Sequence, residues 1–102
     1  VPQDVRAMYA LKGSALAMDV YAMLAERLHR ISGRPITLHW KSLREQFGQE
    51  YTGIEADKDF KKEFLSSLKK VLVVYPTAKV VPVKGGLLLH ASPPPIAYKS
   101  NN

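Results

Sequence analysis

Apolar residues recur with a helical period in two long segments of the chain. In the first segment, apolar side chains between Ala15 and Ile31 share one face, and charged residues occupy the opposite face. Ser14 suits the N-cap position, while Gly33 and Pro35 suit the positions just after a helix end. We therefore expect a first helix over Ala15–Ile31. The side chains expected to be buried are Leu16, Val20, Met23, Leu24, Leu28 and Ile31.

The second segment, Asp57–Val74, has one apolar and one cationic face at the same period. The apolar face holds Phe60, Phe64, Leu68, Val71 and Leu72, and the opposite face holds Lys58, Lys62, Ser66 and Lys69, with Lys61 and Lys70 on the flanks. Asp57 is the expected N-cap, although Thr52 and Glu55 have the spacing of a capping box that would begin the helix earlier. Such a helix is about 27 Å long, which is enough to cross the major groove of DNA. A solvated lysine face on an ordinary core helix is the alternative interpretation.

Two shorter elements are expected between these helices. Ile36–Leu38 alternates and is rich in β-prone residues, which predicts a short strand. Trp40–Phe47 then has the pattern of a two-turn helix that buries its apolar side chains and ends at Gly48. The residues from there to the second long helix are polar and predict a turn.

The C-terminal part of the chain predicts a β-hairpin. Ala78–Val83 and Leu87–His90 are β-prone, and the glycines between them, Gly85 and Gly86, can adopt the positive φ of a tight turn. Because Pro82 has no N–H to donate, the first hairpin strand should lie at the edge of the sheet. The second hairpin strand is then expected to pair with the short strand that precedes Trp40.

The predicted order is helix, strand, helix, helix and β-hairpin, which is the order of the winged-helix fold. We therefore predict an α+β domain with a helix-turn-helix, a three-stranded sheet and a β-hairpin wing. The domain should cover residues 14–92, after an N-terminal arm or short helix over residues 1–13. A Pro-rich exit and a frayed tail are expected over residues 93–102. The chain begins at Val1 rather than at Met, so we expect it to be a piece of a longer protein.

Composition and charge narrow the class of protein. A chain of 102 residues makes one domain, and its 46% hydrophobic and 24% charged residues are typical of a soluble globular protein. No apolar run approaches the roughly 20 residues of a membrane span. Fifteen Lys and Arg against nine Asp and Glu give a net charge of +6, which favours DNA or RNA as partner ahead of an acidic membrane surface. The absence of cysteine excludes disulfides and fits the reducing cytoplasm, where we expect the protein.

Patterns typical of enzymes and of metal sites are missing from the sequence. His29, His39 and His90 are far apart in the chain, and no neighbouring acidic residues complete a ligand set. Gly85 and Gly86 lack the spacing of a phosphate-binding loop. We expect no enzymatic activity, no cofactor, no metal and no small-molecule substrate.

Basic and hydrogen-bonding residues from four elements should converge in the predicted fold. Lys58, Lys61 and Lys62 lie in the first turns of the third helix, the end that enters the groove in helix-turn-helix proteins. Side chains before that helix and on the hairpin would contact phosphates of double-stranded DNA. The expected DNA-binding residues are Lys41, Arg44, Tyr51, Thr52, Lys58, Lys61, Lys62, Lys79 and Lys84. The third helix contains no Arg, Asn or Gln, so the pattern indicates affinity for DNA more clearly than base specificity.

Four segments follow one another in an order and spacing shared with a known family. They are ALAMDVYAMLAERLHRI, ITLHWKSLREQFG, DFKKEFLSSLKKVLVVYP and GGLLLHASPPP. From about Ser14 to Pro95, the chain resembles the C-terminal domain of RepA-type plasmid replication initiators. The resemblance implies a bacterial protein that binds repeated origin sites to start plasmid replication, with this chain as one of two winged-helix units. Asp59–Lys62 and Tyr51 match the basic reader segment of that family.

Two other functions fit the same pattern of elements and charges. A winged-helix transcription regulator would use the same DNA-binding chemistry with a different consequence. A winged helix used for protein contacts, either self-association or recruitment of host replication proteins, would leave the lysines solvated. An exposed apolar patch, for instance around Tyr9, Tyr21 or Val73, would favour this last interpretation.

Overall fold

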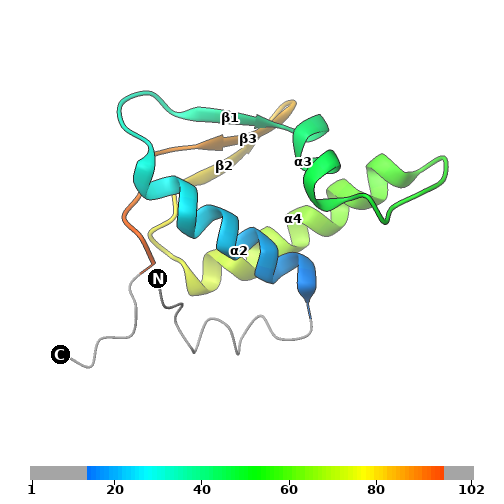
Figure 1. The fold of residues 1–102 in the computed structure, drawn as a ribbon, viewed down its shortest axis with the longest axis horizontal. Coiled ribbons are helices and arrows are strands. Elements are labelled where there is room, and N and C mark those ends of the chain that lie inside the picture. Colours follow the sequence, from blue (N-terminus) through cyan, green and yellow to red (C-terminus); the bar gives the residue numbers. More distant parts are fainter. Residues whose placement is uncertain (1–13, 96–102) are drawn as a thin grey trace.

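A computed structural model describes residues 14–95 as an α+β domain, in which helices pack against one face of an antiparallel sheet (Figure 1). The described part of the chain holds three α-helices, one short 3-10 helix and three strands. In chain order the elements are α2 (Ala15–Arg27), η1 (Leu28–Arg30), β1 (Ile36–His39), α3 (Trp40–Phe47), α4 (Ala56–Val74), β2 (Val80–Val83) and β3 (Gly86–Leu89). The predicted arm over residues 1–13 and the end of the predicted tail, residues 96–102, lie outside the described residues.

The first helix begins as predicted and ends earlier. The side chain of Ser14 accepts a hydrogen bond from the backbone N–H of Ala17 at 3.1 Å, so Ser14 is the N-cap of α2. The α-helix ends at Arg27, and the chain continues through the 3-10 turn η1 before the backbone becomes extended at Ile31. The predicted apolar face is otherwise confirmed, except that Leu16 is only half-buried.

The sheet has the order β1-β3-β2, with both pairs antiparallel. β2, which contains Pro82, lies at an edge, and β3 pairs with β1, as the sequence predicted. β2 is shorter than predicted, since it begins at Val80, and β3 is shifted by one residue to Gly86–Leu89. Gly85 has a φ of +91°, whereas Gly86 is required for another reason: a Cβ there would lie 2.0 Å from the carbonyl oxygen of Leu38.

The third α-helix begins at Ala56, and the predicted N-cap Asp57 therefore lies inside its first turn. Glu55 occupies the N-cap position without a side-chain capping hydrogen bond, so the prediction of an Asp57 cap is wrong. The helix begins early because Gly53, with a φ of +104°, turns the chain and its carbonyl accepts from the N–H of Ala56 at 3.2 Å. The carboxylate of Asp57 binds Arg44 instead.

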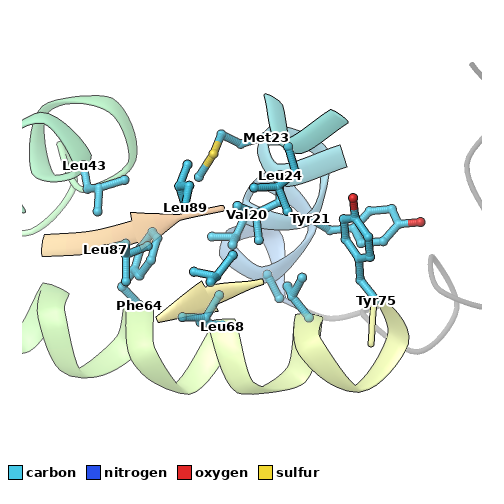
Figure 2. Close-up of a cluster of buried hydrophobic side chains, with 14 of the residues drawn as sticks. Val20, Tyr21, Met23, Leu24, Leu43, Phe64, Leu68, Tyr75, Leu87 and Leu89 are labelled. Carbon is cyan, nitrogen blue, oxygen red and sulfur yellow. The ribbon is translucent and has the colours of Figure 1, made fainter. Parts of the chain in front are cut away.

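The hydrophobic core lies between α2, α4 and the inner face of the sheet (Figure 2). Phe64 is fully buried, and its ring centroid lies 5.6 Å from those of Trp40 and Phe60. Trp40 and Phe47, predicted to be buried, are only half-buried, because α3 covers an end of the core. α4 thus buries the predicted apolar face, apart from half-buried Leu72, and directs its lysines to solvent.

A tyrosine pair closes the other end of the core. Tyr75 follows α4 and packs edge-on against Tyr21, with 6.1 Å between ring centroids (Figure 2). The hydroxyl of Tyr75 donates to the carbonyl of Pro93 at 2.7 Å, and burial raises the pKa of Tyr75 to about 12. This bond ties the segment after β3 to the helices. Within residues 14–95, no helix has the length and apolar character needed to cross a membrane.

Candidate nucleic-acid interface

The outward face of α4 carries exposed lysines in its first turns. At 100° per residue, Lys62 lies nearly opposite the buried side chains of Phe60 and Phe64, and Lys58 lies beside it. Lys62 has no ion-pair partner within residues 14–95, whereas the Nζ atom of Lys58 lies 3.9 Å from a carboxylate oxygen of Glu55. Both members of that pair are exposed to water, so it holds Lys58 weakly. Both lysines are therefore free to contact an anion.

Trp40 links α3 to α4 and to the β2–β3 hairpin. The Nζ atom of Lys61 lies 5.3 Å from the centre of the Trp40 ring, a cation–π distance. The backbone N–H of Trp40 donates to the carbonyl of Gly85 at 3.0 Å, which holds the tip of the β2–β3 hairpin beside α3 (Figure 1). Lys84 precedes Gly85 at that tip, and Lys41 follows Trp40 in α3; both are exposed. We call this arrangement of Trp40, Lys41, Lys61, Lys84 and Gly85 the Trp40 junction.

Arg44 holds the turn between α3 and α4 rather than pointing freely into solvent. Its guanidinium donates from Nε to Asp57 at 2.9 Å and from Nη2 to the carbonyl of Tyr51 at 2.7 Å. A third bond runs from Nη1 to the carbonyl of Gly48. These three acceptors occupy three of the five N–H groups of the side chain, which is only 25% exposed. The predicted phosphate contact would have to use the two remaining N–H groups.

Tyr51 lies beside acidic residues. Its ring packs edge-on against Phe60, with 5.6 Å between the centroids. Partial burial, followed by the charges of Glu63, Glu50 and Asp59, raises the pKa of its hydroxyl. An anionic phosphate would meet the same carboxylates, so the surroundings of Tyr51 disfavour the phosphate contact that the sequence predicted. Its neighbour Thr52 is exposed in the turn.

Lys79 and Lys84 lie at opposite ends of β2. The strand spans Val80–Val83, so the two residues are separated by about 17 Å at roughly 3.3 Å per residue. The backbone of Lys79 bonds to the side chain of Ser92 and to the N–H of His90, at the end of the sheet away from the Trp40 junction. The structure therefore groups Lys84 with the lysines of α3 and α4, and it separates Lys79 from them.

Two features of this surface were not predicted from the sequence. Trp40 was assigned only to the core, yet its half-buried ring also positions Lys61. The carboxylates of Asp59 and Glu63 are exposed on α4 next to the lysines, which makes the first turns of the helix a mixed surface. The alternation of Asp, Lys and Glu at this end was the available signal.

Other kinds of site find less support in the described residues. No group of three or more His, Cys, Asp or Glu side chains within residues 14–95 could hold a metal ion. Of the residues named as a possible apolar patch, Tyr21 is buried and Val73 is 78% exposed, while Tyr9 lies outside the described residues.

No family model matches the chain, and no curated protein or solved structure matches it either.

Proposed function

We propose that this chain is a winged-helix domain that binds double-stranded DNA. The first turns of α4 would enter the major groove, and the β2–β3 hairpin would be the wing that contacts the adjacent backbone. The strand order β1-β3-β2, with the hairpin directly after α4, supports the winged-helix assignment. Lys58 and Lys62 would lie in the groove, and Lys41, Lys61 and Lys84 around it would contact phosphates.

The observation that carries the proposal is the Trp40 junction. A helix with solvated lysines is common in globular proteins, but here the ring of Trp40 contacts Lys61 of α4, and its backbone bonds to Gly85 of the hairpin tip. Lys41 and Lys84, which are exposed, directly adjoin Trp40 and Gly85 in the chain. The cation–π contact and the Trp40–Gly85 hydrogen bond together relate the position of the hairpin tip to that of α4. A phosphate backbone that crosses α3 and the hairpin tip would meet several cations at once, and such clustering favours polyanion binding.

The test is a double charge reversal in α4 with a matched control. Lys58→Glu with Lys62→Glu should weaken binding of a duplex at low salt by at least tenfold, because two attractions to the polyanion become repulsions. Lys69→Glu with Lys70→Glu makes the same charge change in the later turns, where we expect a smaller effect. Fluorescence anisotropy gives the affinities, and thermal unfolding checks that both variants fold. Equal losses in the two variants, or no loss in either, would refute the placement of α4.

The biological role that we propose is origin binding by a plasmid replication initiator. It rests on the resemblance of Ser14–Pro95 to the C-terminal domain of RepA-type initiators. Footprinting the intact protein on the replicon that encodes it should protect repeated sites in the origin. Protection confined to a promoter would instead indicate a transcription regulator that uses the same chemistry.

A role in protein contacts is the second candidate, and the exposed Val73 side chain favours it. Val73 lies near the C-terminal end of α4, about two turns after Ser66, and it does not belong to the Trp40 junction. In a domain that uses only this surface, the charge reversal at Lys58 and Lys62 would weaken duplex binding no more than the reversal at Lys69 and Lys70. The anisotropy titration therefore separates the two candidates.

A further inference from the structure

The exposed polar side chains on the first three turns of α4 belong to few chemical types. They are lysines, carboxylates and one serine: Asp57, Lys58, Asp59, Lys61, Lys62, Glu63 and Ser66. Several have partners, because Asp57 binds Arg44, Lys58 lies near Glu55, and Lys61 lies over Trp40. Asp59, Lys62 and Glu63 form no ion pair within residues 14–95. These side chains are free to face the edges of base pairs.

Lys62 has the central position among them. It lies opposite the buried face of α4, so it points most directly into a groove that the helix enters. Asp59 precedes it by three residues, and side chains with this spacing are neighbours on a helix surface, about 5–6 Å apart at Cβ. A positive donor and a negative acceptor therefore stand side by side at the predicted point of closest approach.

The major-groove edges of the base pairs differ in how well they match a lysine with an aspartate beside it. Guanine presents two adjacent acceptors, O6 and N7, in the major groove, and its partner cytosine presents the N4 amino donor. An ammonium group can donate to both guanine acceptors, while a carboxylate accepts from cytosine. At adenine an ammonium group finds only one acceptor, N7, because the neighbouring N6 is a donor, so it gains one hydrogen bond instead of two. The side chains that read adenine best, Asn and Gln, do not occur in α4.

We propose that Lys62, with Asp59 beside it, makes α4 a reader of G·C base pairs in the major groove. The preferred duplex has a guanine at the position that faces Lys62. This inference rests on the proposed function, since it assigns a class of target site to the same helix. It adds base specificity to a surface whose lysines otherwise indicate affinity alone.

The first experiment is selection of bound sequences from a pool of random duplexes with the full 102-residue chain. The bound fraction should be enriched in a G·C pair at one fixed position. With Lys62→Ala the enrichment at that position should disappear. With Lys69→Ala, which removes the same charge from a later turn, it should remain. Retention of the enrichment in the Lys62→Ala variant would overturn the assignment.

The second experiment changes single atoms of the selected guanine. Hypoxanthine keeps O6 and N7 and loses only the minor-groove amino group, so its duplex should bind like the G·C duplex. Replacement by 7-deazaguanine, or of the whole pair by A·T, should weaken binding by about 5- to 100-fold. Weaker binding with hypoxanthine and unchanged binding with 7-deazaguanine would place the readout in the minor groove and overturn the inference.

The outcomes separate this inference from the proposed function. If the chain binds all duplexes equally and the double charge reversal of Lys58 and Lys62 still abolishes binding, the DNA-binding function holds and the G·C inference is wrong. If the chain binds no duplex at low salt, both are wrong.

Discussion

Arg44 connects three separate parts of the backbone around the turn that leads into α4. Because its guanidinium bonds reach Gly48, Tyr51 and Asp57, the side chain fixes the position of the first turn of the helix. Lysine has the same charge and no planar fork, so it cannot reproduce the three bonds together. Its three bonds give Arg44 a structural role, which differs from its predicted role as a free phosphate contact.

We expect Arg44→Lys to lower the free energy of unfolding by about 1–3 kcal/mol, since two backbone carbonyls lose charged donors. Urea unfolding measures the change. Arg30→Lys is the matched control, because Arg30, at the end of η1, is exposed and forms a surface ion pair with Glu26 of α2. That variant should differ from the wild-type chain by less than about 0.5 kcal/mol. Equal stability of the two variants would show that the Arg44 bonds do not hold the turn.

The contrast between Phe64 and Arg44 shows which residue roles can be predicted from sequence. The burial of Phe64 follows from the helical period, because period alone determines which face of α4 meets the core. The acceptors of Arg44 are mostly backbone carbonyls whose positions depend on the turn after α3. Residue type and spacing do not predict the conformation of that turn. The same reason explains why the acidic surroundings of Tyr51 were not predicted.

The β2–β3 hairpin and α4 show which features of an element could be predicted from the sequence. Its edge position and its pairing with β1 were predictable, because Pro82 and the Gly85–Gly86 pair impose strong backbone constraints. The start of α4 was not predictable to the residue, because several residues before the helix compete as caps. The position of the hairpin tip beside Trp40 depends on a tertiary hydrogen bond, which only the structure reveals.

We expect Lys84→Ala and Lys79→Ala to affect DNA binding differently. Lys84 lies at the tip near the lysines of α3 and α4, so its loss should reduce the slope of log K against log salt by about 1. Lys79 lies about 17 Å away along the strand, and its loss should leave the slope unchanged. Anisotropy titrations over a series of salt concentrations give both slopes. A larger change for Lys79→Ala would place the DNA across the other end of the sheet.

For the whole molecule, the net charge of +6 attracts any polyanion, and the arrangement of the lysines determines how many phosphates are neutralised. Lys41, Lys58, Lys61, Lys62 and Lys84 form the surface that we expect to meet DNA. If at least four of them contact phosphates, log K should fall against log salt with a slope of about −4, since each contact contributes about 0.9. A titration of the full chain with a duplex of fixed length measures this slope. A flat salt response would mean that these lysines are only solvated, and it would favour the role in protein contacts.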